Sequence, residues 1–531
     1  MTLTATSPLK QTEPAQQTQE ATPVAARRPN RRAVMVSAVL TQLMIVLDLT
    51  IIAIALPHMQ EDLGMTVSQS PWTVTGYSLA FGGLVLFGGR LCAVVGIRRS
   101  YQVGLIGFGI ASLAAGMATS FSVLLAARVA QGCFGALLAP TSQSLLNVTF
   151  TERTERERVF AIFGATGGLG AAVGLLVGGA LTDWFSWRWA LYINILLAAA
   201  ALLIGQRSLP PADQRDRGSR ITDDLSGLVL GCGACFSAVY GLDRAQQTSW
   251  TSTSTVSWLA LGGIAAALFV VRERFASRPV LPLSMMALPV RAASYATQFV
   301  VGAAQMGAII YLTYYMQNHF GYSPLKSGVV FLPMVLALIA TAIPAGRIIV
   351  PRLGARGTLP LGLAVLAGAF LIFSRMTTES TYEHVALPGL IVFGMGLGLT
   401  MPVTFNSGTR GVDAKRTGLA SAILSAAQQI GGSFGVALMT SYATQHAEDY
   451  VTDHAAQVRA EAMEAMMRAQ ALPQSPTGKQ IIESLKAELI DRAQIEAYSG
   501  GFSMMTWLLA GAATVLVACG IGLSLRRRRR R

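Results

Sequence analysis

Apolar residues occupy the chain in long blocks that are separated by mostly short polar connections. The blocks are about 17 to 25 residues long, which is the length that an α-helix needs to cross the hydrocarbon core of a bilayer. Fourteen such blocks predict fourteen spans in an all-α polytopic membrane protein. The expected spans cover residues 33–57, 71–92, 100–118, 121–148, 157–181, 187–206, 224–243, 255–273, 289–316, 325–349, 357–375, 384–409, 416–440 and 501–525.

The composition and the distribution of charge agree with a membrane location. Hydrophobic residues make up 52% of the chain and charged residues only 13%, with a mean hydropathy of +0.49, whereas a soluble protein carries about 25% charged residues. The net charge of +14 would suit a nucleic-acid-binding protein, but 31 of the 41 Lys and Arg residues lie in the termini and in every second connection. The positive-inside rule therefore predicts a multi-pass plasma-membrane protein with both termini cytoplasmic and no nucleic-acid partner.

Three polar segments lie outside the spans. Residues 1–32 are rich in Thr, Gln and Pro and predict a disordered cytoplasmic N-terminus. Residues 526–531 form a basic cytoplasmic tail. Residues 441–500 predict an extracytoplasmic loop that contains one helix over 458–472 and a second over 478–497, with prolines between them. This loop is either a solvated cap or a lid over the substrate path.

Two charged residues lie inside apolar spans, Asp48 in span 1 and Arg128 in span 4. A charge in hydrocarbon costs about 3 kcal/mol on insertion scales, so each side chain must face protein or a water-filled cavity. At 1.5 Å per residue, both residues lie about 10–13 Å from the outer ends of their helices. We expect Asp48 to be the proton site and Arg128 its electrostatic modulator, paired or coupled across a cavity. Separate hydrogen bonds to other polar groups are the alternative.

Span 5 contains glycines at a spacing of four residues, Gly170, Gly174 and Gly178. These glycines share one face of the helix. Such a face permits close packing of two helices, and sliding or bending during a conformational change is the alternative function.

Several motifs resemble those of a known transporter family. The motifs LDLTIIAIALP (47–57), RVAQGCFGALLAP (128–140) and GATGGLGAAVGLLVGG (164–179) resemble three signatures of major facilitator drug exporters. Further segments are similar to the fourteen-span drug:proton antiporter branch, namely WRWALYINI (187–195), GYSPLKSGVVFLP (321–333), TGLASAILSAAQQIGGSFGVA (417–437) and AYSGGF (497–502). The resemblance covers about residues 33–525.

This resemblance implies the major facilitator fold, with two six-helix bundles, two extra central helices and alternating access driven by proton influx. The first bundle would be residues 33–206, and a cytoplasmic linker with the two extra helices would be residues 207–273. The second bundle would comprise five helices in residues 274–440 and a last helix over 501–525.

The cytoplasmic turn after span 2 departs from the family pattern. The family reads roughly G-x-L-x-D-R-x-G-R-R, but GRLCAVVGIRR (89–99) has Ala93 in place of the acid and Val94 in place of the base. Because the acid helps to latch the cytoplasmic gate in the family, latching is expected to be weaker here or to use other groups. The counterpart GRIIVPRLGAR (346–356) also lacks the acid, and Leu175 replaces the proline of the family's glycine run. The residues expected to serve gating and helix packing are Gly89, Gly96, Arg98, Gly170, Gly174 and Gly178.

Other polar and aromatic residues within the spans are candidates for the substrate cavity between the bundles. Interhelical hydrogen bonding is the alternative role of the amides, and anchoring at the membrane interface is the alternative for the aromatic residues. The candidates are Trp72, Tyr77, Gln131, Asn194, Gln305, Asn406 and Gln428.

The sequence contains no phosphate-binding G-x-x-x-x-G-K-[ST] loop, catalytic triad or metal-ligand cluster. The five cysteines lie in apolar blocks, and the C-x-x-C of Cys232 and Cys235 has no second pair, so we expect core residues there. We therefore expect neither an enzyme nor a cofactor or metal. The favoured function is proton-coupled export of small amphiphilic drugs or an antibiotic by a monomer. The alternatives are proton-coupled uptake of a metabolite by symport, or a transport-inactive membrane sensor or scaffold.

Overall fold

The computed structural model describes residues 30–529, with gaps at 67–68, 70–71, 207–208, 210–224, 277–278, 280, 282–284, 287, 413–416 and 469–474. All regular elements in this part of the chain are helical. Residues 1–29 of the expected disordered N-terminus and most of the linker after the first bundle lie outside the described residues, as do the last two arginines of the basic tail, whereas Arg31 and Arg32 already belong to the first helix.

The first bundle consists of six helices. In this bundle α1 packs against α5 and α6, whereas α3 and α4 pack against each other. α2 packs against α4, and α6 also contacts α3. The helix bounds are α1 Arg31–Asp62, α2 Trp72–Val95, α3 Ile97–Gly116, α4 Phe121–Thr149, α5 Arg153–Trp184 and α6 Trp187–Gly205.

The second bundle follows the same plan with more irregular helices. In this bundle α9 packs against α14, α12 against α13 and α15, and α11 against α13. The α-helices are α9 Pro289–Tyr314, α10 Pro324–Val330, α11 Leu332–Pro344, α12 Val350–Phe373, α13 Leu387–Thr409, α14 Thr417–Arg468 and α15 Pro476–Arg529. Short π-helical turns extend three of them, η3 Tyr315–His319, η4 Ala345–Ile349 and η5 Tyr382–Ala386.

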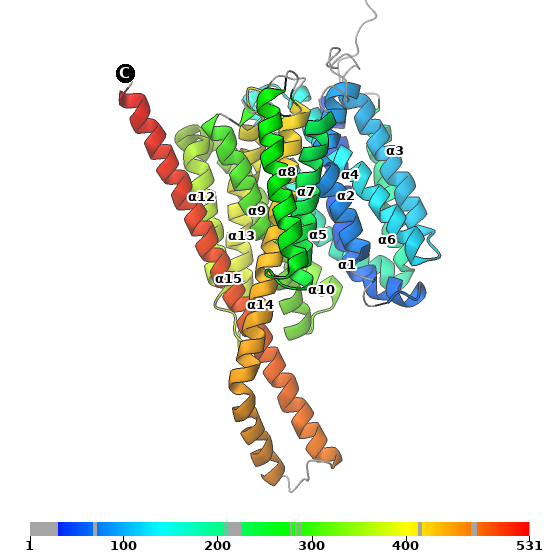
Figure 1. The fold of residues 1–531 in the computed structure, drawn as a ribbon, viewed down its shortest axis with the longest axis vertical. Helices are drawn as coiled ribbons and strands as arrows, with labels where there is room; N and C mark the ends of the chain where they lie inside the picture. Colours follow the sequence, from blue (N-terminus) through cyan, green and yellow to red (C-terminus); the bar gives the residue numbers. More distant parts are fainter. Residues whose placement is uncertain are drawn as a thin grey trace, which may run out of the picture.

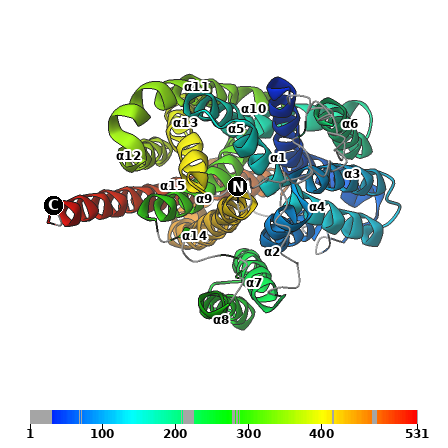
Figure 2. The ribbon, with the colours of Figure 1, turned by 90° about the horizontal axis from the view of Figure 1, so that it is seen from above.

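Two additional helices, α7 (Leu225–Gln247) and α8 (Thr253–Phe275), stand outside both bundles. Seen from above, they lie beside α2 and α14, and α8 is the outermost (Figure 2). α7 packs against α2 and α14, whereas α8 packs chiefly against α7. The pair therefore covers one side of the seam between the bundles.

Residues that favour helix ends separate these elements. Gly96 and Gly354 have φ angles of 97° and 65°, which glycine adopts more easily than other residues, and they separate α2 from α3 and interrupt α12. Ser186, Ser252 and Ser323 accept hydrogen bonds from backbone N–H groups at the starts of α6, α8 and α10.

The structure differs from the expected loop over residues 441–500. α14 and α15 are 52 and 54 residues long, and they extend beyond the bundles as an antiparallel helical hairpin (Figure 1). A 52-residue helix is about 78 Å long, far more than the roughly 30 Å of the hydrocarbon core. The chain contains no Gly or Pro between Gly435 and Pro473, so nothing in the sequence ends α14 at the membrane surface.

Among the described residues, each expected span overlaps a helix, with ends that differ by a few residues outside the hairpin of α14 and α15. Eleven helical stretches of the described residues are long and apolar enough to cross a membrane, and one of them, residues 325–373, holds two expected spans joined at Gly354. α3 and α5, with 20 and 32 residues, lie outside those eleven stretches. The protein is thus a polytopic helical membrane protein, and fourteen crossings remain our prediction.

Candidate functional site

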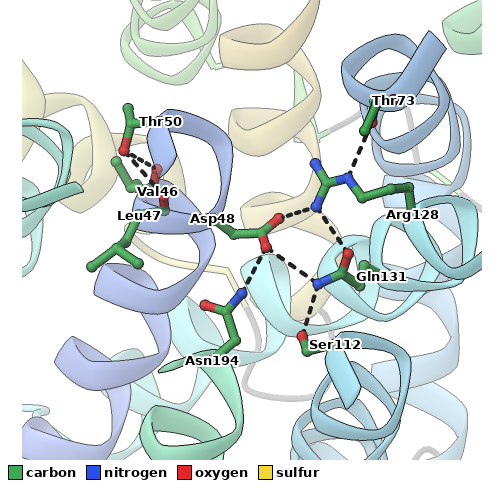
Figure 3. Close-up of polar contacts among 9 residues, drawn as sticks. All are labelled: Val46, Leu47, Asp48, Thr50, Thr73, Ser112, Arg128, Gln131 and Asn194. Carbon is green, nitrogen blue, oxygen red and sulfur yellow. Dashed lines mark hydrogen bonds and ion pairs between the residues drawn. The ribbon is translucent and has the colours of Figure 1, made fainter. Parts of the chain in front are cut away.

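The two charges expected inside the first bundle form a direct ion pair (Figure 3). Nη1 of Arg128, on α4, donates a hydrogen bond of 2.6 Å to Oδ2 of Asp48, on α1. Both side chains are 0% exposed. The alternative of two separate, unpaired charges is therefore wrong for this conformation.

Two further helices, α6 and α3, contribute to the carboxylate site. Nδ2 of Asn194, on α6, donates to Oδ1 of Asp48 over 2.7 Å, and Nε2 of Gln131 donates to the same oxygen over 3.2 Å. Nε2 of Gln131 also donates to Oγ of Ser112 on α3 over 2.7 Å, and Oε1 of Gln131 accepts from Arg128 over 2.9 Å. A change in the charge of Asp48 therefore acts on α1, α3, α4 and α6 together.

Arg128 also binds α2. Its Nε donates to the carbonyl of Thr73 over 3.0 Å, and its guanidinium carbon lies 4.6 Å from the centre of the Tyr77 ring. Four buried polar atoms here have no partner among the described residues: Nη2 of Arg128, the hydroxyls of Thr73 and Tyr77, and Oδ1 of Asn194. Because buried polar groups almost always have a partner, we expect water to bind these atoms.

The other cavity candidates lie in two different places. Gln428 on α14 and Gln305 on α9 contact each other in the second bundle, with 3.5 Å between Nε2 and Oε1. Asn406, on α13, has a buried Oδ1 without a partner among the described residues. Trp72 faces the extra helices instead, with its ring centre 6.3 Å from that of Tyr240 on α7. Tyr77, Gln131 and Asn194 are thus the candidates that meet the ion pair.

The glycine face of α5 packs on the helix that carries Asp48. A Cβ atom added to Gly170 would lie 3.1 Å from Val46, and one added to Gly178 would lie 3.0 Å from Ile51. A Cβ atom on Gly174 would collide with the hydroxyl of Thr50. Close packing of α5 on α1 therefore requires small residues at these positions.

A second close contact joins the two bundles at the opposite end from the hairpin. A Cβ atom on Gly89 of α2 would lie 2.5 Å from Cβ of Ala422 and 3.0 Å from the carbonyl of Gly418, both on α14. Arg98 instead donates to the carbonyl of Gln206 over 3.3 Å, so it braces the first bundle internally.

Sequence reasoning missed several residues that join the bundles at this end. Nε2 of Gln143, on α4, donates to Oγ of Ser425 over 3.3 Å, and Thr409 donates to Oδ1 of Asn147 over 3.1 Å. The pairs are 282 and 262 positions apart in the chain. The polar run after Pro140 in span 4, SQSLLN, was the available signal.

An aromatic cluster completes this junction. The ring of Phe405, on α13, stacks at 6.3 Å on Phe160 of α5 and meets Phe163 edge-on at 6.2 Å. All three side chains are buried, with Phe160 at 0% exposure. Apolar packing thus closes this end of the seam.

Sequence reasoning also missed a group of hydrogen bonds that joins α1 to α6 at the opposite end of the first bundle. Asp62, after α1's apolar stretch, accepts a 2.6 Å bond from Nη1 of Arg188 and a 3.2 Å bond from the Trp187 indole. The Arg188 hydrogen bond is the main cause that holds the pKa of Asp62 below its ordinary value.

Comparisons with known proteins agree with this architecture. The sequence profile of the Major Facilitator Superfamily matches residues 38–436. The chain is 40% identical over 432 residues to the puromycin resistance protein of Streptomyces alboniger, covering 80% of this chain and 84% of that one. It is 33% identical over 406 residues to the cephamycin export protein of Amycolatopsis lactamdurans, covering 76% and 83% of the two chains.

A solved structure supports the fold alone. The human organic anion transporter MFSD10 (TETRAN) superposes with a TM-score of 0.56 at 14% identity, covering 91% of this chain and all of that one. Together with the sequence relatives, the two bundles and the buried charges of α1 and α4, this identifies the chain as a member of the major facilitator superfamily, a multi-pass membrane transporter of small molecules and not an enzyme.

Proposed function

We propose that the protein exports a small amphiphilic drug or antibiotic from the cytoplasm across the plasma membrane in exchange for protons. Two relatives that cover most of the chain are named for puromycin resistance and cephamycin export. The observation that carries the coupling is the buried Asp48–Arg128 pair. The orientation, with both termini cytoplasmic, and the monomeric state are parts of the same proposal.

Protonation of Asp48 would change the energy of the whole network. A neutral carboxyl leaves Arg128 buried without a counter-charge, and breaking one side of a buried pair costs about 3–5 kcal/mol. A change of about 5.5 kcal/mol moves a two-state equilibrium from 1:99 to 99:1. One proton therefore supplies most of the free energy needed to change the preferred conformation of the first bundle.

The direction of coupling follows from alternating access. A proton that reaches Asp48 from outside weakens its bond to Nη1 of Arg128, and the guanidinium, whose Nη2 already has no partner among the described residues, is then left without its counter-charge. Substrate that arrives from the cytoplasm restores pairing when it displaces the proton. Tyr77, Gln131 and Asn194 would line the cavity from the first bundle, and Gln305, Asn406 and Gln428 from the second.

The cytoplasmic gate would close without the family's acid. Ala93 occupies that position, and the junction instead rests on the stack of Phe405 with Phe160 and on the Gln143–Ser425 pair. We propose that this apolar and uncharged junction opens and closes once in each cycle, with α5 and α14 moving against their neighbours.

Transport in proteoliposomes tests the proposal. Vesicles with an imposed pH gradient are loaded with puromycin, and the movement of drug and proton is followed together. Drug movement driven against its gradient by opposite proton flow supports antiport. Drug and proton moving in the same direction would indicate symport, and no movement with correctly folded protein would favour a sensor or scaffold.

A further inference from the structure

A groove opens between α12, α15 and the start of α9, away from the ion pair. Two adjoining cavities form it and share Arg356, Pro360 and Gly520, and the larger has a volume of about 640 Å³. α15 diverges from the bundle towards its C-terminus (Figure 1), and the larger cavity is open on one side. Apolar side chains dominate its walls, chiefly Val290, Leu359, Leu361, Leu516 and Val517.

The groove extends over most of the depth of one leaflet of the hydrocarbon core. On α12 it runs from Arg356 to Ala364, and on α15 from Gly520 to Ala513. These eight and seven residues correspond to about 12 and 10 Å of helix, while half of the hydrocarbon core is about 15 Å thick. A crevice that opens to the bilayer along this depth is in contact with lipid tails.

Positive charge is confined to one end of the groove. Arg356 is the one charged residue among those that line it, and both Arg356 and Arg352 are exposed. Six arginines, residues 526–531, follow Gly520 within eleven positions of the sequence. Clusters of four to eight basic residues directly beyond a membrane helix are typical of segments that attract anionic lipids.

We propose that this groove is a binding site for an anionic phospholipid of the cytoplasmic leaflet. One acyl chain lies between α12 and α15, and the phosphate binds Arg356, with the arginine tail adding attraction. The leaflet rests on the proposed orientation, whereas the site itself is independent of substrate and proton coupling. The lipid fills the space that α15 leaves and so braces the last helix against α12.

Two matched pairs of variants test the site. A Cβ atom on Gly520 or on Gly511 of α15 meets no atom within 4 Å, so leucine fits at both positions, but only Gly520 lines the groove. Arg356→Gln removes the charge at the mouth, and Arg99→Gln removes an exposed arginine at the start of α3 as its control.

The readout is native mass spectrometry of detergent-purified protein titrated with dioleoyl phosphatidylglycerol or dioleoyl phosphatidylcholine. Gly520→Leu should weaken binding of both lipids by at least about tenfold, as expected for an obstructed apolar pocket, while Gly511→Leu should bind as wild type does. Arg356→Gln should lower the preference for phosphatidylglycerol by about fivefold, and Arg99→Gln should leave it unchanged.

The proposal is overturned if both groove variants bind the two lipids as wild type does. It is equally overturned if only deletion of residues 526–531 changes binding, because the tail would then attract lipid without a groove. Elution of each variant as a folded species in size-exclusion chromatography separates loss of binding from loss of structure, and Arg356→Gln decides the matter if Gly520→Leu does not fold.

Discussion

Gly89 of α2 and Ala422 of α14 face each other across the seam between the bundles, and a single methyl group on Gly89 would bring two carbon atoms to 2.5 Å. We therefore expect Gly89→Ala to disfavour the conformation seen here by about 1–3 kcal/mol, the usual cost of overpacking. Cys92 is buried at the same contact, with its Sγ 3.3 Å from a Cβ atom built on Gly418. The accessibility of the Cys92 thiol should therefore show whether the two helices have separated.

The measurement is the rate at which a polar maleimide modifies Cys92 in inside-out vesicles, with the other four cysteines replaced by serine. The rate should rise at least about fivefold in Gly89→Ala. Gly109→Ala is the control, because its new Cβ atom would meet Cβ of Ala198 at an ordinary 3.6 Å. Equal rates in the two variants would show that the Gly89 contact does not control the gate.

The Asp48–Arg128 ion pair predicts how substitutions of Asp48 affect the coupling of export to proton movement. Asp48→Asn keeps the shape of the side chain but cannot titrate, so uphill export should be abolished while substrate binding stays measurable. Asp48→Glu should retain part of the activity. Substrate-induced proton release in proteoliposomes is the test, and an Asp48→Asn protein that exports against a gradient as well as wild type would make the residue structural.

Arg128→Lys should weaken coupling although it conserves charge. The guanidinium binds Asp48, Gln131 and the Thr73 carbonyl at once, and one ammonium cannot reproduce this planar fork. The ratio of drug moved to protons moved should fall, with binding affinity affected less. An unchanged ratio would assign Arg128 to packing rather than to coupling.

The aromatic junction predicts that loss of the Phe405 ring lets substrate leak through the protein. Phe405→Ala removes the stack on Phe160 and the edge contact with Phe163, and truncation of a buried Phe costs about 3–5 kcal/mol. We expect downhill substrate leak and a lower maximal gradient in proteoliposomes. Phe236→Ala, at a side chain that is 38% exposed on α7, is the control. If Phe405→Ala vesicles leak no more substrate than wild type, the aromatic junction does not close the transport path.

The topology can be tested independently. Reporters fused after Arg220 and at Arg531 should be cytoplasmic, and one at Gln474 extracytoplasmic. Removal of residues 450–490, joined by a short flexible linker, should leave insertion intact and change transport by less than tenfold, or about 1.4 kcal/mol. Complete loss of transport at normal membrane levels would make the hairpin a working lid.

The sequence predicted the helical spans and the depth of the central charges because both depend on local patterns. Asp48 and Arg128 came out at similar depth from counting residues along two helices, although that count leaves their separation open. Ser112 and Thr73 carry no local signal, since a hydroxyl and a backbone carbonyl are common in every span.

The aromatic junction of Phe160, Phe163 and Phe405 could not be predicted either, because its residues carry no local signal. Phe160 and Phe405 look like ordinary apolar residues until α5 and α13 are placed side by side. The sequence predicted two short helices in the hairpin. It did not predict that α14 continues unbroken into the hairpin, because the only indication was the absence of Gly and Pro between Gly435 and Pro473, and the polar composition there suggested a loop.

Because α14 is one unbroken helix of 52 residues, a rotation at one end moves the other end by a much larger distance. Gly418, in its first turn, packs against Gly89 at the junction of the bundles, and its last residue, Arg468, lies at the far tip of the hairpin. Over a helix about 78 Å long, a tilt of about 5° at the gate would displace the tip by about 7 Å. A small tilt at the junction is thereby magnified at the tip of the hairpin, which the proposed orientation places outside the cell, so a probe attached there should report each transport cycle.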